Sequence, residues 1–255
     1  MMDTFTAKDL DSMDLRPPKQ LVPGVLTAGL NILAGNPKSG KSFLSLGLAL
    51  ALTNGKPAFD RYHVEETGVL YCALEDTKYR LKARIKTLQQ PSNPLLHFTT
   101  KLPRLGDGGL QEIDEFCGMH PEVGLVVIDT LAKVADPKTG NNVYDDDAAL
   151  GSSLHGLAHH HDIAILLVHH TRKAAAGDFM HAVSGSAGLT GTADVVMVLT
   201  RKRGEQTAVL EITGRDITES KTNLTWFASR GGWAVADAPD PYARPKPPAM
   251  PRYHA

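Results

Sequence analysis

The chain has 255 residues, of which 42% are apolar, and this length suits one large α/β domain with short tails. Its formal net charge of -1 excludes a uniformly basic surface, so any contact with nucleic acid has to come from particular loops or from the channel of a ring. The only cysteines, Cys72 and Cys117, lack the spacing of a disulfide framework or a metal site, which fits a reducing cytoplasm.

Residues 1–20 are polar and charged and predict a leader, and residues 21–236 predict a single domain that the chain enters through 21–26. No apolar run approaches the roughly 20 residues that cross a bilayer, so we expect a soluble cytoplasmic protein with no membrane partner. Residues 237–255 contain six prolines among basic residues and predict a disordered tail. That tail is either a solvated end or a tether for a partner or nucleic acid.

Strand and helix patterns alternate along the domain. The predicted strands are 31–34, 69–74, 97–99, 125–129, 163–169, 194–200 and 207–213. The predicted helices are 43–52, 77–89, 110–119 and 145–160. Such alternation is typical of a three-layer α/β fold with a mostly parallel central sheet. After residue 194 the strands follow one another without helices, which predicts an antiparallel C-terminal extension at one edge.

The first strand leads into a complete P-loop. Its residues are Gly35, Asn36, Pro37, Lys38, Ser39, Gly40, Lys41 and Ser42, and an apolar helix begins at Phe43. Backbone N–H groups of such a loop surround phosphates, Lys41 is spaced to reach the β and γ oxygens, and the Ser42 hydroxyl is placed to ligate Mg²⁺. An ordinary glycine-rich turn is the alternative, but the strand before it and the helix after it disfavour that. The sequence therefore predicts a nucleoside triphosphate site, with Phe43 as its last member.

The strand 125–129 ends in Asp129, as a Walker B strand does. Its apolar residues predict a buried strand whose carboxylate emerges at the carboxyl end, beside the P-loop. Apolar runs that end in aspartate are common, so the Walker B interpretation of this strand depends on the P-loop upstream of it. We expect Asp129 to orient Mg²⁺ from just outside its direct ligands.

The strand 69–74 is followed by Glu75 and Asp76. Ligands bind at the carboxyl edge of open α/β sheets, so Glu75 is our candidate catalytic base for the attacking water. Alternatively, both acids begin the next helix, where negative charge suits the positive end of the helix dipole. That role fits Asp76, and we assign catalysis to Glu75.

The strand 163–169 ends in the pair His169 and His170. One of them could hydrogen-bond the γ-phosphate and respond to its loss. A residue just past a strand usually faces the ligand, which favours His170 slightly over His169. A zinc site with residues 159–161 is disfavoured because those histidines end a helix at the other end of the strand. They are more simply solvated or helix-capping.

Together these blocks resemble the RecA-like P-loop ATPases, and within them the RepA-type branch of the hexameric replicative helicases, which are related to the DnaB-like ones. The resemblance covers about residues 20–228 and includes the P-loop, Glu75, Asp129, the histidine pair and the segments 184–186 and 193–196. It implies ATP and Mg²⁺ as cofactors, a homo-oligomer of hexameric type, water activation by Glu75 and γ-phosphate sensing by His170 or His169.

The resemblance also implies an arginine that completes the active site of a neighbouring subunit. The segment 210–216 is similar to the family's segment, and Arg215 is its basic residue. DnaB-like members usually carry a lysine two residues earlier, where this chain has Thr213, so the group acting on the neighbour would be a single cation. The alternative for Arg215 is a surface salt bridge at a strand end.

Two connections correspond to channel-lining loops of the family, 134–147 and 171–184. The second carries Arg172 and Lys173 among small residues, which suits contact with the phosphate backbone of single-stranded DNA. The first carries three aspartates at 145–147, and this acidity argues against simple DNA gripping.

Three functions fit these observations. The first is an oligomeric motor that acts on single-stranded DNA as a replicative helicase. The second is a non-motor ATPase such as a recombination mediator, a loader or a KaiC-like switch, which the acidic loop and the near-neutral charge favour. The third is a small-molecule kinase, which would need an acceptor pocket and a lid. Unwinding of forked DNA distinguishes the first, and phosphoryl transfer to a metabolite the third.

Overall fold

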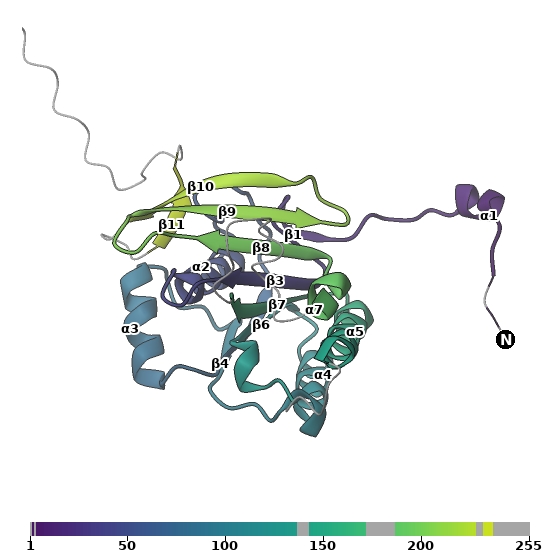
Figure 1. Ribbon diagram of the computed structural model, residues 1–255, viewed down its shortest axis with the longest axis horizontal. Helices are drawn as coiled ribbons and strands as arrows, with labels where there is room; N and C mark the ends of the chain where they lie inside the picture. Colours follow the sequence, from purple (N-terminus) through teal and green to yellow (C-terminus); the bar gives the residue numbers. More distant parts are fainter. Residues whose placement is uncertain (1, 3, 137–142, 172–186, 228–231, 237–255) are drawn as a thin grey trace, which may run out of the picture.

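A computed structural model describes residues 2, 4–136, 143–171, 187–227 and 232–236 of the chain (Figure 1). Its main sheet has the strand order β11-β10-β9-β8-β3-β7-β6-β4-β5. The strands are β3 (Gly29–Gly35), β4 (Gly68–Ala73), β5 (Leu96–Thr99), β6 (Val123–Asp129), β7 (Ala164–His170), β8 (Val195–Thr200), β9 (Thr207–Gly214), β10 (Ser220–Phe227) and β11 (Gly232–Val235). Each strand expected from the sequence is present, with boundaries shifted by one or two residues.

The strands from β8 to β5 are parallel, and β3 lies between β7 and β8. In this register Gly35, at the end of β3, lies opposite His170 on β7 and Leu199 on β8. The carboxyl ends of the parallel strands therefore meet at one edge of the sheet, where open α/β folds bind ligands.

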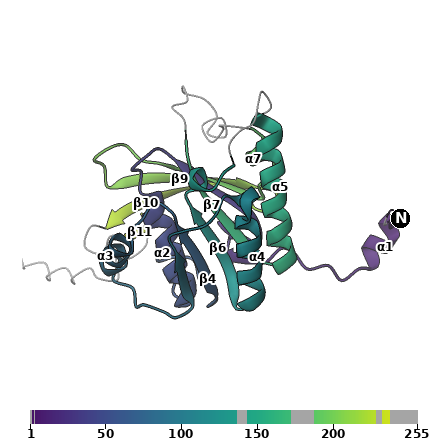
Figure 2. The same ribbon diagram turned by 90° about the horizontal axis from the view of Figure 1, so that it is seen from below.

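Helices cover both faces of the sheet, as Figure 2 shows. The helices are α2 (Lys41–Thr53), α3 (Lys78–Leu88), α4 (Gly109–Met119), α5 (Val143–His161) and α7 (Ala187–Thr192), with short 3-10 turns η1 (Leu105–Asp107) and η2 (Leu131–Lys133). One apolar core contains α2 and α3 side chains, and a second, on the opposite face, contains those of α4, α5 and α7. The expected three-layer arrangement is confirmed.

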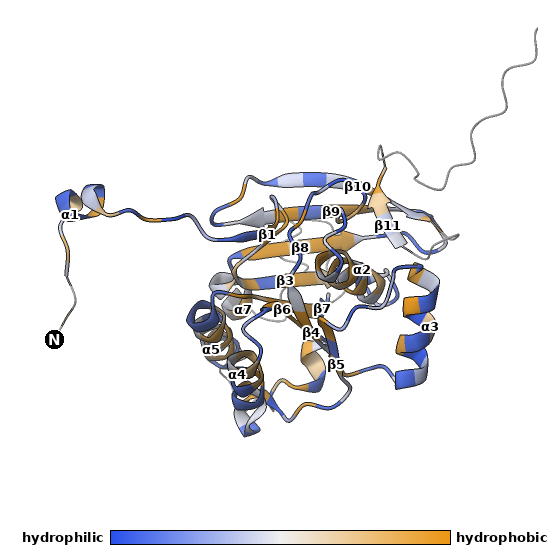
Figure 3. Cartoon of the chain, turned by 180° about the vertical axis from the view of Figure 1, so that it is seen from behind, coloured by the Kyte–Doolittle hydropathy of each residue, from blue (hydrophilic) through white to orange (hydrophobic). Residues whose placement is uncertain are grey.

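The central strands and α2 are the most hydrophobic parts of the chain, whereas β10 is largely polar (Figure 3). The seven residues of β6 are all buried, as are most of α2. An element that is apolar all round has to be covered on every side, and this explains why α2 lies against the sheet centre with β11 packed beside it.

The C-terminal part is antiparallel, as expected. β8 pairs with β9, β9 with β10 and β10 with β11. The last two strands were not expected from the sequence. β10 alternates only weakly and is mostly polar, and β11 is short, so neither carries a clear strand pattern.

The N-terminal leader contains helix α1 (Ala7–Ser12), which begins with a capping box between Thr6 and Asp9. In Figure 1 α1 lies apart from the sheet, at the end of an extended segment. The chain next forms its own two-stranded sheet from β1 (Gln20–Val22) and β2 (Leu26–Thr27). The side chains of Leu21, Val22, Val25 and Leu26 pack into the core, while β1 and β2 pair with each other and not with the main sheet.

The proline-rich tail at 237–255 lies outside the described residues. Among the described helices, none is both long enough and apolar enough to span a membrane.

Candidate nucleotide-binding and hydrolysis site

The loop from Gly35 to Ser42 connects β3 to α2 at the carboxyl edge of the sheet. Both of its outer glycines are required by the geometry. A Cβ on Gly35 would lie 2.6 Å from the carbonyl oxygen of Leu199, and Gly40 caps α2 with φ of 105°, a left-handed conformation. The first N–H groups of α2 have no acceptor within the helix and attract anions. The loop therefore has the form of a phosphate site.

Lys41 is the first residue of α2, and its side chain is 4% exposed. Its ammonium group donates to the carbonyl oxygens of Gly35 at 2.8 Å and Asn36 at 2.9 Å. Burial lowers the pKa of Lys41 to about 8, although Asp129 and Glu75 oppose the change. A charge so poorly solvated gains strongly when a phosphate approaches, because the phosphate replaces lost hydration.

His170 lies next to this lysine. Its Nδ1 atom is 3.3 Å from Nζ of Lys41, and it forms part of the cavity wall. Burial lowers the pKa of His170, and the charge of Lys41 lowers it further. A neutral imidazole at this position can exchange a hydrogen bond with a γ-phosphate. His169 precedes it on β7, where it lies opposite Ala34. His170 is thus the histidine in contact with Lys41, and it is also the one that the sequence slightly favoured. Its role as a γ-phosphate sensor stays a prediction.

Asp129 ends β6 and is 4% exposed. Its Oδ2 atom accepts a hydrogen bond from the Tyr71 hydroxyl at 2.9 Å, and that hydroxyl is 2.8 Å from Ser45 Oγ. Burial raises the pKa of Asp129, and hydrogen bonds from Ser42 and Tyr71 oppose the rise. Its Oδ1 atom is buried without a hydrogen-bond partner among the described residues.

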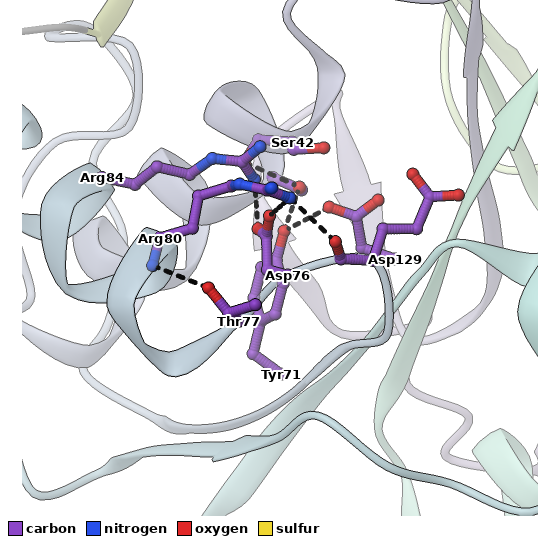
Figure 4. Close-up of polar contacts among 9 residues, drawn as sticks. Ser42, Tyr71, Asp76, Thr77, Arg80, Arg84 and Asp129 are labelled. Carbon is purple, nitrogen blue, oxygen red and sulfur yellow. Dashed lines mark hydrogen bonds and ion pairs between the residues drawn. The ribbon is translucent and has the colours of Figure 1, made fainter.

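This donor set fits a divalent cation. A buried carboxylate oxygen without a partner is costly, and a hydrated Mg²⁺ beside Ser42 would satisfy it. Ser42 and Asp129 lie close together in Figure 4, as the P-loop assignment requires. The arrangement agrees with Mg²⁺ held by the Ser42 hydroxyl and, through water, by Asp129, which stays a prediction.

Glu75 and Asp76 differ sharply in their surroundings. Glu75 lines the cavity with Lys41, while Asp76 forms ion pairs with Arg80 at 3.2 Å and with Arg84. The helix cap is Thr77, whose hydroxyl accepts the Arg80 N–H at 3.2 Å. The expectation that Asp76 begins the helix is therefore corrected: it is an acceptor for two arginines of α3. Glu75 remains positioned as the candidate base.

The cavity that these residues line has a volume of about 550 Å³. The cavity is also lined by three residues that the sequence did not indicate, Arg84, Arg201 and Trp226, and by Phe43, which it did. Phe43 was assigned to the nucleotide site as the end of the P-loop, and its ring meets Trp226 edge-on at 5.1 Å.

Arg201 links this part of the cavity to the P-loop helix. Its guanidinium carbon lies 5.8 Å from the Trp226 ring centre and 5.1 Å from that of Trp233. The Trp233 indole N–H in turn donates to the Gly40 carbonyl at 3.2 Å. Both tryptophans lie on strands that carried no clear sequence pattern, so only their aromatic character could have marked them. A flat aromatic and guanidinium surface of this kind suits a nucleobase.

Arg215 lies far from this cavity in its own chain. It follows β9, where Gly214 is opposite Val195 at the start of β8, whereas the P-loop lies near the end of β8. Its guanidinium donates to the Gly191 carbonyl at 2.8 Å and lies 3.8 Å from Asp194. The ion pair considered from the sequence is present, and the side chain is still 55% exposed.

The two predicted channel loops are only partly described. Arg172 and Lys173 lie outside the described residues, but Thr171 just before them bonds Asn36 of the P-loop at 3.0 Å. In the other connection, residues 145–147 belong to the first turns of α5 and not to a loop. Acidic side chains suit the N-terminal end of a helix, which accounts for their charge without reference to DNA.

A P-loop, a buried aspartate at the end of β6 and a glutamate that follows β4, all lining one cavity, define a P-loop ATPase. A family model described as an AAA domain matches residues 1–176, well over half of the chain. The chain belongs to this AAA domain family and is an ATP-hydrolysing enzyme.

Solved structures agree on the fold. The ATPase domain of G40P is similar over 89% of this chain and 95% of its own, with 13% identity and a TM-score of 0.63. A DnaB-like replicative helicase, studied with its interactions with primase, is similar over 89% of this chain, with 14% identity and a TM-score of 0.64. The present chain spans 64% of that protein's length. A comparison with curated proteins found no match. The RecA-like fold expected from the sequence is confirmed.

Proposed function

We propose that this chain is an oligomeric motor ATPase, a replicative helicase of RepA type that acts on single-stranded DNA. The observation that carries the proposal is the separation of two sets of groups. Lys41, Glu75, Asp129 and His170 meet in one cavity, while Arg215 is held at the opposite edge of the sheet. A second copy of the chain could bring its Arg215 to this cavity, so each site would be shared by two subunits.

In this mechanism Glu75 accepts a proton from the attacking water, and the loop N–H groups with Lys41 hold the transferred phosphoryl oxygens. Mg²⁺, when bound, neutralises charge on the β and γ oxygens. His170, in contact with Lys41, responds to release of the γ-phosphate. It is followed by Thr171 and then by Arg172 and Lys173, so the proposed DNA contacts are two and three residues from the proposed phosphate sensor.

Self-association has a physical basis in the leader. Helix α1 buries none of its residues, and exposed apolar side chains surround it: Phe5, Leu10, Met13 and Leu15. A groove of about 890 Å³ runs along α3 beside β5, lined by apolar Leu81, Ile85 and Phe98 and by basic Lys78, Lys82 and Lys86. Asp9, Asp11 and Asp14 give the leader the opposite charge. We therefore propose that α1 of one copy docks in this groove of the next.

The direct test combines purified protein, ATP and forked DNA. The motor proposal expects unwinding that requires ATP, stimulation of hydrolysis by single strands, and loss of both in Glu75→Gln. Hydrolysis indifferent to single strands, with no unwinding, would contradict it. Native mass measurement of wild type and Leu10→Asp tests the docking: the variant should dissociate, and the matched variant Lys8→Asp, whose side chain lies outside the apolar set, should not.

A non-motor ATPase that changes its assembly state is the second candidate. It is favoured by the net charge of -1, which provides no general attraction for DNA. It expects nucleotide-dependent association with slow hydrolysis, and DNA translocation would exclude it.

A further inference from the structure

Two histidines and a glutamate gather at the edge of the sheet away from the nucleotide cavity. His97 is the second residue of β5, His120 follows the last residue of α4, and Glu122 directly precedes β6. His97 lies in β5, while His120 and Glu122 lie in the short turn between α4 and β6, and none of them lines the nucleotide cavity. Their approach is therefore not explained by ATP chemistry.

The distances suit a common ligand. One donor atom from each residue lies within 4.8 Å of the donor atoms of the other two, and Nδ1 of His120 is 3.0 Å from Oε1 of Glu122. Ligands about 2.0–2.1 Å from a tetrahedral Zn²⁺ lie roughly 3.4 Å apart, so small side-chain rotations bring the set to the ion. Two imidazoles and one carboxylate form a donor set that Zn²⁺ takes in proteins.

The backbone holds all three positions. The Glu122 carbonyl accepts from the Gly68 N–H at 2.7 Å and from the Thr67 hydroxyl at 3.1 Å. The His120 N–H donates to the Phe116 carbonyl at 3.0 Å at the end of α4. His97 is paired with Leu70 in the sheet. The donors are thus carried by a strand and by a short turn whose backbone is hydrogen-bonded.

The imidazole rings of His97 and His120 are oriented by ring contacts that do not involve an ion. The Phe116 ring stacks on His120 at 4.3 Å and meets His97 edge-on at 5.3 Å, while the two imidazoles are 4.8 Å apart. Within the described part of the chain the His97 side chain makes these ring contacts and no hydrogen bond. Its nitrogens are available to a metal, and both histidines are only half-buried, which leaves a route for the ion.

A second group on the surface provides a natural comparison. Asp114, His160 and His161 also meet the distance condition, but two of these residues, Asp114 and His160, are exposed, against only Glu122 in the first group. These residues lie on α4 and at the end of α5, without an aromatic ring that fixes them. They fit a plain surface ion pair.

We propose that His97, His120 and Glu122 bind one Zn²⁺ ion, with water in the remaining position. The ion would connect the start of β5, the end of α4 and the start of β6, three segments that are otherwise linked by the sheet and by ring packing. Its expected role is to stabilise this edge of the domain, at a distance from ATP hydrolysis.

The test uses the full chain after treatment with a chelator. Isothermal titration with Zn²⁺ should give one ion per chain, and Co²⁺ should produce the visible absorption of a tetrahedral site. His97→Ala and Glu122→Gln should each weaken Zn²⁺ binding by at least about tenfold, since even residues that only orient ligands change metal affinity 10–100-fold. The matched variant His160→Ala should bind as wild type does.

The folding of each variant is checked by circular dichroism and by ATP hydrolysis, which should be unchanged in both groups. Absence of Zn²⁺ binding by wild type would overturn the proposal. So would equal binding by wild type and His97→Ala, or loss of binding in His160→Ala, which would assign the metal to the other group.

Discussion

The Tyr71 hydroxyl donates to Oδ2 of Asp129 from the neighbouring strand, at 2.9 Å. Tyr71 is fully buried, and the bond fixes one carboxylate oxygen while the other stays available to a cation. The aspartate at the end of β6 is therefore oriented by a residue from the strand that also carries Glu75. The apolar strand pattern did not indicate this, because a tyrosine in a buried strand is usually part of the core.

Tyr71→Phe should weaken the response to Mg²⁺. Without the hydroxyl, Asp129 loses one of its donors, and the free energy of unfolding should fall by about 1–3 kcal/mol because the buried carboxylate is less well satisfied. We expect the Mg²⁺ concentration needed for half-maximal hydrolysis to rise several-fold. Ser45→Ala is the matched control, since its hydroxyl contacts Tyr71 and the Ser42 carbonyl but not Asp129. Equal Mg²⁺ dependence in Tyr71→Phe and wild type would disprove the orienting role.

Lys41→Ala and Glu75→Gln should separate binding from chemistry. Removing the buried ammonium group should abolish most ATP affinity, because it lies within the loop that holds the phosphates. Glu75→Gln keeps the shape of the cavity and should bind ATP as wild type does, with hydrolysis reduced by about 10²–10⁴-fold. Equilibrium titration and phosphate release measure the two effects. If Glu75→Gln hydrolyses ATP normally, the base is another residue.

ATP affinity should fall as pH rises above about 8, which is where burial places the Lys41 pKa. The charged lysine binds phosphate and the neutral one does not. At a pH above this pKa, ATP binding therefore requires Lys41 to take up a proton. Dissociation constants at pH 7, 8 and 9 measure this. Lys41→Ala has no group that titrates in this range, so its ATP affinity should be weak and should not fall with pH in the same way. An equal fall of ATP affinity with pH in this variant would assign the effect to another group.

Intrinsic fluorescence should report nucleotide binding, because the only two tryptophans of the chain, Trp226 and Trp233, lie beside the P-loop. Trp226→Leu should weaken ATP binding by about 1–3 kcal/mol, at least about fivefold, if the base stacks on this ring. Tripolyphosphate has no base, so its affinity should not change in the same variant. Equal losses for both ligands would show that Trp226 supports the loop and not the base.

Arg215→Ala should reduce hydrolysis by about 10³-fold with ATP binding intact, as loss of an arginine finger does. Mixing it with Glu75→Gln should restore part of the activity, because an intact cavity of one variant would meet the intact arginine of the other. A structural role in the ion pair with Asp194 predicts a different result. In that case Arg215→Ala and Asp194→Asn would lower thermal stability alike, and mixing would restore nothing.

The parallel half of the fold followed from the sequence because each of its strands is short, apolar and separated by an amphipathic or capped helix. The P-loop indicated that the site lies at the carboxyl edge of the sheet. Asp129, Glu75 and His170 could then be predicted as site residues, since the parallel strands end at that same edge. Arg84, Arg201 and Trp226 could not be found in this way. Their positions depend on α3 and on antiparallel pairing between distant segments, and neither leaves a local pattern.

Because β3 lies between β7 and β8, the residues that line the cavity fall into two groups, one on each side of the P-loop strand. On one side, β7, β6 and β4 carry the residues assigned to the phosphates and to water. On the other side, β8 and β10 carry Arg201 and Trp226. Substitutions on the antiparallel side could therefore change which nucleobase is accepted and leave the cleavage chemistry intact. We therefore expect the preference among nucleotides and the hydrolysis rate to be separately adjustable.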